Sequence, residues 1–314
     1  MELIQRYASM TIKIINASTA SRMFRALEQL AGKFVVFRGH QNSKWRLSST
    51  LNRHQRAPWH PNTSWAVDEM LRRFLINLKL IGVDPPYRVD SPYRDDTRRG
   101  RLEFGRHYGV PSPLIDFSRS PYIAAFFAFS GVRPYESKPI DRSAIYCVNV
   151  FELAGVWARL MTPKFGAATA ADATEISRTF TESHNDFIYA EPQFEKEYPP
   201  NRLKFVELPA SWNRRMQRQI GCFLYDSMNY QLSGFKDLED FLGQSEVPRH
   251  PDGAEPMLTK IIAPHSIGRE VLERLDLMGI SATHLYDSHE GAAIDVVNEY
   301  SYSKRTARAW DLKI

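Results

Sequence analysis

The sequence predicts an α+β fold, a single mixed domain in which a central β-sheet is flanked by helices. Segments whose apolar residues recur at helical spacing alternate irregularly with short β-branched and aromatic runs typical of strands. No internal repeat or clear linker divides the chain, and its 314 residues, 43% of them hydrophobic, suffice for a sizeable core. We therefore expect a helical segment at 1–32, one domain at 33–300 and a tail at 301–314.

The chain begins with a predicted helix that Ser18 or Thr19 can cap and that ends near Gly32. Residues 34–37 then form a β-branched and aromatic run that predicts a buried strand. This strand should place Arg38 at its end, followed by a glycine that permits close approach of a ligand. An arginine in this position can clamp a ligand or can pair structurally with a nearby carboxylate, and the sequence leaves both open.

The middle of the chain is predicted to contain two helices separated by a loop. Residues 67–81 have helical spacing and stop at a glycine, whereas residues 84–101, with three prolines, predict a loop that can cover or contact a substrate. Ser120 is a good cap for the helix over residues 122–129, which is apolar on all sides and should be buried. The amino end of this helix, beside Ser118, can bind an anion.

The second half is predicted to alternate strands with helices. The expected strands are residues 144–151, 203–208, 222–225 and 283–286. A helix is expected at 267–278, closing at a glycine, and a last helix from Ala292 onward. Residues 155–200, rich in alanine and threonine, receive no assignment.

Charge and cysteine content indicate no special class of protein. Lys and Arg number 41 against 36 Asp and Glu, an excess too small to demand a nucleic-acid partner. Arginines cluster at 94–106 and 214–218, where we expect solvated helix faces rather than phosphate-binding surfaces. Cys147 and Cys222 each lie in an apolar, strand-like run, so we predict buried free thiols rather than a disulfide.

Several functional classes lack their sequence signatures. No signal peptide or membrane-spanning run is readable, so we expect a cytoplasmic protein with no membrane contact. The histidines are scattered and the cysteines too few for a metal site. The phosphate loop of kinases, the dinucleotide fingerprint of dehydrogenases and the nucleophile elbow of hydrolases are all missing. We therefore do not expect a kinase, a dehydrogenase or a hydrolase of these common types.

Candidate functional residues lie where polar groups stand among glycines and prolines. We predict that Arg38, His107, Tyr108, Asp116 and Gln219 converge on one cleft and carry any catalysis. Asp116, between two apolar neighbours, would either pin its loop as a buried acid or contact a ligand, and it can orient the histidine. Further contacts to the ligand are expected from Gly39, Ser112, Ser118 and Arg215.

These motifs resemble the bacterial FRG family, named for the tripeptide Phe37-Arg38-Gly39. The other matching motifs are Trp45-Arg46-Leu47, Arg53, His107-Tyr108-Gly109-x-Pro111, Asp116, Arg215-Met216-x-x-Gln219-x-Gly221-x-Phe223 and Leu285-Tyr286-Asp287-x-x-Glu290-Gly291-Ala292-Ala293. The resemblance therefore extends from about Val35 to Ala293. Where the family usually has an arginine after the His-Tyr-Gly motif, this chain has Pro113, so no anion contact is carried over to that position.

The order of motifs is also similar to the ADP-ribosyltransferase plan, which would make the fold ADP-ribosyltransferase-like. That similarity implies NAD as a substrate rather than a permanently bound cofactor, with an arginine on the first strand holding it and Tyr108 as an aromatic wall. It also implies a late catalytic acid. Glu195 or Glu197, in an acid-rich stretch, and Glu290 are the candidates, and the sequence leaves the choice open.

Two functions follow from these patterns. The first is an intracellular NAD-using enzyme, an ADP-ribosyltransferase or NAD glycohydrolase acting as a toxin or as a defence effector against phage. The second is a non-catalytic module that binds a nucleotide or nucleic acid through its arginines and the region of Trp45, Trp59 and Trp65. Either a protein or a nucleic acid can be the target, and the oligomeric state is open.

Overall fold

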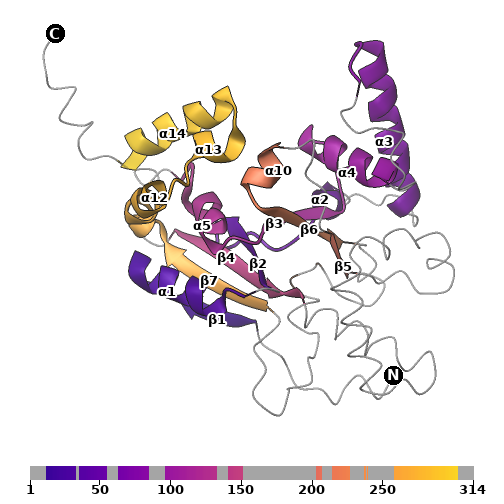
Figure 1. Cartoon of the computed structure of the whole chain (residues 1–314). Helices are drawn as coiled ribbons and strands as arrows, with labels where there is room; N and C mark the ends of the chain where they lie inside the picture. Colours follow the sequence, from indigo (N-terminus) through magenta and orange to yellow (C-terminus); the bar gives the residue numbers. More distant parts are fainter. Residues whose placement is uncertain are drawn as a thin grey trace, which may run out of the picture.

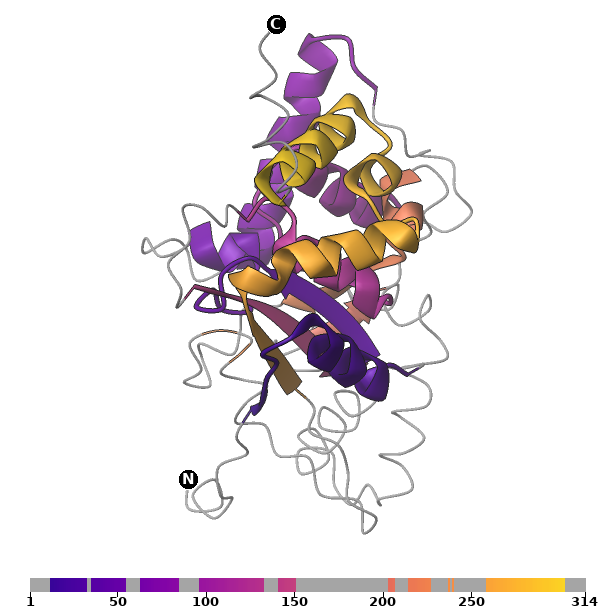
Figure 2. The ribbon, with the colours of Figure 1, turned by 90° about the vertical axis from the view of Figure 1, so that its left-hand side faces the viewer.

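The fold is α+β, as predicted, and is built on one mixed sheet (Figures 1 and 2). The computed structural model describes residues 12–32, 35–54, 63–84, 96–132, 141–150, 203–206, 214–226, 237, 239 and 258–302. The seven strands of this part are β1 (Lys13–Asn16), β2 (Val35–His40), β3 (Leu114–Ser118), β4 (Arg142–Asn149), β5 (Leu203–Val206), β6 (Gly221–Asp226) and β7 (Leu258–Pro264). They lie in the order β1-β7-β4-β2-β3-β6-β5, and β1 alone among them runs parallel to its neighbour.

The helices of the described part fall into an early and a late group. The early ones are α1 (Ala20–Leu30), α2 (Thr50–His54), α3 (Thr63–Leu80), α4 (Asp96–His107) and α5 (Pro121–Phe129). The late ones are α10 (Arg214–Arg218), the short 3-10 turn η3 (His265–Ile267), α12 (Gly268–Leu277), α13 (Ala282–Tyr286) and α14 (His289–Tyr302). None of the described helices is long and apolar enough to cross a membrane.

Helix α5 forms the centre of the main core. Ser120 caps it, as predicted, by accepting a hydrogen bond from Ile123 N, and six of its nine residues are buried. It lies so close to β2 that a Cβ on Gly39 would stand 2.0 Å from Ala124 O. Close approach at this glycine therefore serves the packing of a helix, and the same core takes in side chains of α1, α12 and α13.

The face of the sheet that carries α5 is called the helical face here. Phe37 of β2 contributes to the α5 core, and its paired residues in β4 and β3 are Cys147 and Ser118, so these three share that face. Arg38 and His40 alternate with Phe37 along β2 and so belong to the opposite face, together with Tyr146, which pairs with Arg38.

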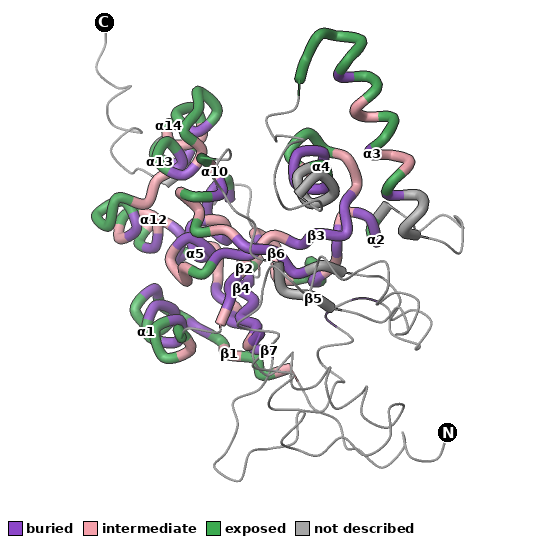
Figure 3. Tube along the Cα trace, turned by 45° about the vertical axis from the view of Figure 1, so that its right-hand side comes forward, coloured by how far each residue is buried: buried purple, intermediate pink, exposed green. Residues whose placement is uncertain are grey.

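A second apolar cluster joins α2, α3, α4 and α10 to β3 and β6. Its buried members are Leu51, Val67, Leu71, Leu102, Leu114, Met216 and Phe223. Strands β3, β4 and β7 and helix α5 are largely buried, whereas β1, α3 and α14 expose much of their surface (Figure 3). The second cluster therefore attaches a peripheral group of helices to the far half of the sheet.

The sheet is incomplete between β2 and β3. β2 pairs with β4 through six consecutive residue pairs, and β3 pairs with β6 through five. Between β2 and β3 the single pair is Phe37 with Ser118. Beyond that pair the two strands no longer bond to each other, and this open stretch, the β2–β3 seam, is where the polar residues gather.

Several local predictions need correction. β2 continues to His40, so Arg38 lies inside the strand and not at its end. Residues 96–101, expected in a loop, begin α4. The predicted strand at 283–286 is helical, because Ser281 caps it by accepting from His284 N and Asp287 ends it in the left-handed conformation. The last helix begins at His289, three residues before the predicted start.

The N-terminal segment is part of the sheet. β1, which the sequence analysis did not identify, pairs with β7, and α1 packs into the same core as α5. Thr19 is the α1 cap, one of the two predicted residues, and accepts from Arg22 N. Cys147 in β4 and Cys222 in β6 are buried free cysteines, as predicted.

Candidate functional site

A cavity of about 860 Å³ lies at the β2–β3 seam. Its lining comprises Phe37, Arg38, Gly39, His40, Gln41, Lys44, Trp45, Arg46, Ser48, Asn52, Arg53, Asp116, Phe117, Ser118, Phe127, Arg215, Gln219, Asp237 and Tyr286. Residues from both faces of the sheet take part, because the two strands separate here. The described lining has five basic side chains and two acidic ones, so the cavity is cationic.

Arg38 is fixed at the seam by both strands. Its Nε donates to His40 Nε2 over 2.9 Å, and its Nη1 donates to the main-chain oxygen of Asp116 over 2.5 Å. Burial lowers the pKa of Arg38 to about 10 although the Asp116 carboxylate opposes the shift, so the guanidinium stays charged at neutral pH. Arg38 thus bridges the gap that main-chain hydrogen bonds leave open.

His40 acts as a neutral acceptor for Arg38. Burial, together with the charge of Arg38, lowers the pKa of His40 to about 3. Because Nε2 accepts from Arg38, the ring proton is assigned to Nδ1, which lies 3.3 Å from the Trp45 main-chain oxygen. The histidine therefore connects the arginine to the loop that follows β2.

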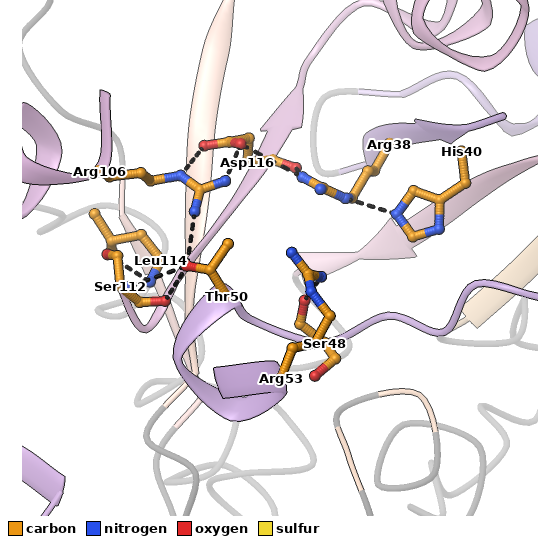
Figure 4. Close-up of polar contacts among 9 residues, drawn as sticks. All are labelled: Arg38, His40, Ser48, Thr50, Arg53, Arg106, Ser112, Leu114 and Asp116. Atoms are coloured by element: carbon orange, nitrogen blue, oxygen red, sulfur yellow. Dashed lines mark hydrogen bonds and ion pairs between the residues drawn. The ribbon is translucent and has the colours of Figure 1, made fainter. Parts of the chain in front are cut away.

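Asp116 is held mainly by Arg106, at the end of α4 (Figure 4). Arg106 forms two hydrogen bonds to the carboxylate, one of them over 2.6 Å to Oδ1, and Arg38 lies 3.6 Å from Oδ2. Burial raises the pKa of Asp116, but Arg106 outweighs it, and the pKa falls to about 2. Asp116 is thus ionised, and half of its side chain is still exposed.

Arg53 adds a third guanidinium to this group. It lies on α2, donates to Ser48 O over 2.8 Å, and is directed toward Arg38 and Asp116 (Figure 4). Burial and the charge of Arg106 both lower its pKa. No described carboxylate forms an ion pair with Arg53 or Lys44. The three arginines at the seam, Arg38, Arg53 and Arg106, thus have Asp116 as their one shared carboxylate among the described residues.

The end of the cavity on the helical face is aromatic. The Arg215 guanidinium stands 4.2 Å from the centre of the Tyr286 ring, a cation–π contact. Phe127 of α5 packs against the same ring with a centroid distance of 6.2 Å. Gln219 follows α10, and its side chain donates to Leu285 O over 3.3 Å. This end therefore joins α5, α10 and α13.

The end on the opposite face rests on a buried polar network. Arg46 makes two hydrogen bonds to Asp237, and Lys260 lies 3.2 Å from Glu239. The Tyr146 hydroxyl lies 2.8 Å from Glu239 Oε2 and 2.8 Å from Trp45 O. Both acids are thus satisfied by protein groups, and the network fixes the backbone under the exposed Trp45 ring.

Six of the nine predicted site residues line the cavity, and three do not. Those in the lining are Arg38, Gly39, Asp116, Ser118, Arg215 and Gln219. His107 and Tyr108 are exposed at the end of α4, where the tyrosine packs against Phe104 with a centroid distance of 5.0 Å. Ser112 is buried and donates its N–H to Thr50 Oγ1 over 2.9 Å. Tyr108 therefore does not supply the expected aromatic wall.

Ser118 is engaged within the protein. Its hydroxyl donates to Gln219 O over 2.7 Å and accepts from Ser120 N over 3.0 Å. The amino end of α5, proposed from the sequence as an anion site, thus meets a serine whose hydroxyl proton is already donated within the protein. The positive charge of the cavity comes from its arginines and Lys44.

Three residues of the site were missed, namely Arg53, Arg106 and Tyr286, whereas Trp45 was expected to bind a nucleotide or nucleic acid and lines the cavity. Arg106 had been grouped with a solvated arginine cluster, but its side chain is only 14% exposed. A sequence signal existed, since it directly precedes the His-Tyr-Gly motif and lies ten residues before Asp116. Tyr286 and Arg53 stood in the quoted motifs, but nothing in the spacing linked them to Arg38.

Of the other candidate acids, Glu290 alone lies among the described residues. Glu195 and Glu197 lie outside the described residues, as does Trp59, and nothing is described of the Trp65 side chain. Glu290, on α14, is exposed and not part of the cavity. In the described ranges no group of three or more His, Cys, Asp or Glu side chains is arranged to hold a metal ion.

Comparison with known proteins gives one match. The sequence model of the FRG domain matches residues 33–137. No curated protein and no solved structure matches the chain significantly. The matched segment holds Arg38, Arg53, Arg106 and Asp116, and thus the whole charged group at the seam. The similarity to ADP-ribosyltransferases stays a prediction.

Proposed function

Residues 33–137 carry an FRG domain, and we propose that the cavity around its Phe-Arg-Gly tripeptide binds a nucleotide. The observation that carries this proposal is the excess of guanidinium groups at the seam. Arg38, Arg53 and Arg106 surround the single carboxylate of Asp116. The positive charge that this carboxylate does not neutralise is suited to binding a phosphate. Trp45, 53% exposed at the cavity, offers a face for a base.

The cavity also has the size and composition of a ligand site. Its volume of about 860 Å³ falls within the range of about 300 to 1,000 Å³ common for small-molecule sites. Its polar groups are presented by two strands, α2 and α10, and so stand on regular elements rather than on loops alone. Arg38 loses little freedom on binding, because His40 and Asp116 already hold it.

The test is the affinity for ADP, measured by calorimetry, of the wild type and of four variants. Arg38→Ala should weaken binding by about 2 to 5 kcal/mol. Arg38→Lys should restore little of this affinity, because an ammonium group cannot form the paired hydrogen bonds of a planar guanidinium. Arg53→Ala, at an exposed position, should weaken it about tenfold with the fold intact. Arg73→Ala is the matched control, an exposed arginine on α3 outside the cavity. Equal affinities in all five proteins would refute the proposal.

A second function, cleavage of NAD, is favoured by the state of Asp116. An ionised, half-exposed carboxylate at a cationic cavity can stabilise the oxocarbenium-like ribose that forms as the nicotinamide bond breaks. Nicotinamide would leave with the bonding electron pair, and water or a nucleophile of a macromolecule would then attack the ribose carbon. The protein would act as an NAD glycohydrolase or ADP-ribosyltransferase, in the role of a toxin or phage-defence effector.

Release of nicotinamide from NAD tests this second function separately. The wild type should release it and Asp116→Asn should not, while the variant still binds ADP. A wild type that binds ADP but leaves NAD intact would restrict the protein to nucleotide binding.

A further inference from the structure

We infer that the cavity binds a nucleoside triphosphate as the free anion, with arginines in the role that a magnesium ion has at other sites for this class of ligand. This inference rests on the proposed nucleotide function and adds the class of nucleotide and the form in which it binds. The observation behind it is an excess of positive charge in a cavity whose described acids are both already bound by arginines.

The charge of the cavity matches a triphosphate better than a shorter phosphate chain. The five bases of the described lining outnumber its two acids by three. Arg106 binds Asp116 from outside this lining and raises the excess to four, while His40 stays neutral. A nucleoside triphosphate carries about four negative charges at neutral pH, up to about two of them on its terminal phosphate. A diphosphate would leave about one positive charge of the cavity without a counterpart.

The arginines at the seam repel one another. Burial lowers the pKa of Arg38; the Asp116 carboxylate opposes this shift, but the charges of Arg106 and Arg53 add to it. The pKa of Arg53 is lowered in the same way by burial and by Arg106. Three guanidinium groups around one carboxylate therefore raise the free energy of the protein, and an anion that binds between them removes this cost. The gain grows with the charge of the anion, so a third phosphate adds to it.

Neither acid of the described lining is placed to hold a metal ion beside the phosphates. Arg106 donates to both oxygens of the Asp116 carboxylate, and Arg46 donates to both oxygens of Asp237. Mg²⁺ at a nucleotide site is usually held by one or two carboxylates together with phosphate oxygens. At the seam the ion would have to displace a guanidinium from its carboxylate. It would also lie close to the charge of Arg38, which is 3.6 Å from Asp116 Oδ2.

Two further cations can contact the added phosphate. Arg53 gives one N–H to Ser48 O and is directed toward the seam (Figure 4), and its guanidinium carries further donors. Lys44 lines the same cavity and directly precedes Trp45, the ring on which the base is proposed to stack. Neither cation forms an ion pair with a carboxylate of the described ranges. The phosphate chain can therefore be bound by Arg53 and Lys44 in addition to Arg38.

The experiment compares ATP with ADP by calorimetry on the full chain, first in EDTA and then with an excess of Mg²⁺ over nucleotide. In EDTA we expect ATP to bind at least about tenfold more tightly than ADP, since one added charge-assisted hydrogen bond suffices for this factor. Mg²⁺ should weaken ATP binding at least about tenfold, because it cancels about half of the charge of the phosphates. NaCl at the same ionic strength is the control for screening and should weaken binding less.

Three variants assign these effects to the cavity. Arg53→Gln and Lys44→Gln should each lower the ratio of ATP to ADP affinity about threefold, as expected for exposed cations. Asp116→Asn should bind ATP in EDTA at least as tightly as the wild type, because the change removes a negative charge from the seam. Arg73→Gln, at an exposed arginine outside the described lining, is the matched control and should change neither quantity.

The outcomes separate the inference from the proposed function. Binding of ATP that Mg²⁺ strengthens, or weakens no more than NaCl does, overturns the inference, and so does equal affinity for ATP and ADP in EDTA. A preference for ATP that neither Arg53→Gln nor Lys44→Gln reduces, or a loss of ATP binding in Asp116→Asn, overturns it as well. The nucleotide function stands in each of these cases if Arg38→Ala still weakens ADP binding. Failure of both nucleotides to bind overturns the proposed function and the inference together.

Discussion

The two edges of β2 differ in what holds them. Toward β4 the strand is closed by six consecutive pairs, from Val35–Asn149 to His40–Ala144, and α5 lies directly over it at Gly39. Toward β3 one pair remains, and arginine contacts to Asp116 replace the missing main-chain bonds. One six-residue strand therefore serves the core on one edge and a cationic cavity on the other.

The difference shows how a polar site can lie at the centre of a sheet without unfolding it. Apolar packing under the closed edge secures the strand, so the open edge can be left to charged groups. An isolated buried guanidinium would be costly, but Arg38 has His40, the Asp116 main chain and a nearby carboxylate as partners.

The largest expected effect lies under the closed edge. Phe129 is fully buried in the α5 core, so Phe129→Ala should lower the free energy of unfolding by about 3 to 5 kcal/mol. Phe127 belongs to the helix that the sequence predicts to be buried on all sides, but it is only partly buried and lines the cavity. Phe127→Ala should therefore cost less than half as much, and urea denaturation of both variants would show it. Equal losses would mean that the cavity wall is part of the core.

The next effect is a pH dependence at the open edge. The folded-state pKa of His40, about 3, is below the ordinary value of 6.5, so the unfolded chain takes up a proton first as the pH falls. Stability from this group is complete above about pH 6.5 and is lost on acidification. Between pH 6.5 and about 4.5 the wild type should lose about 2 kcal/mol more than His40→Gln, as urea denaturation across this range would show. Parallel curves would show that His40 is not held neutral.

Asp116 should matter at lower pH and by a smaller amount. Its folded pKa, about 2, is below the ordinary 3.8, so its contribution is present above about pH 4 and is lost as the pH falls toward 2. Asp116→Asn should cost about 1 to 2 kcal/mol at neutral pH, because Arg106 loses its partner but half of the carboxylate is screened by solvent. Glu273→Gln removes one partner of an exposed ion pair with Arg269 and should leave the free energy of unfolding nearly unchanged. Thermal unfolding of both variants would compare the two effects. Equal effects of the two changes would contradict a structural role for Asp116.

The smallest expected effect is an increase in stability. Ile220, between α10 and β6, has a φ of 46°, a left-handed conformation that a β-branched residue adopts only at a cost. Ile220→Gly should raise the free energy of unfolding by about 0.5 to 1 kcal/mol, as the relief of strain exceeds the added entropy of the unfolded chain. Ile14→Gly, an exposed isoleucine in the extended strand β1, should lower it. A loss in both variants would show that Ile220 is unstrained.

The sequence predicted the closed edge better than the open one. The apolar helix α5, its Ser120 cap and the two buried cysteines follow from local composition, which is a property of neighbours along the chain. The sequence analysis did not identify strand β7, and it predicted a strand at residues 283–286, which form a helix. A short apolar run fits a strand or a helix equally well until its capping residues are known.

The site depends on partners that are far apart in sequence. Arg38 and Asp116 were predicted together from motifs, but the part played by Arg106 depends on α4 ending beside β3. Tyr286 enters because α13 lies against α5 and α10, a long-range arrangement that no spacing reveals. Tyr108, on the other hand, stands in a strong motif and still points to α3 and α4. Motifs thus identified the segments of the site but not which side chains face the cavity.

The most direct test of the central claim, that the open seam is the ligand site, is a crystal structure of the protein with ADP. We expect the diphosphate within hydrogen-bonding distance of the Arg38 and Arg53 guanidinium groups, between β2 and β3. ADP bound instead at the exposed Arg214 and Arg218 surface, with the seam empty, would contradict it.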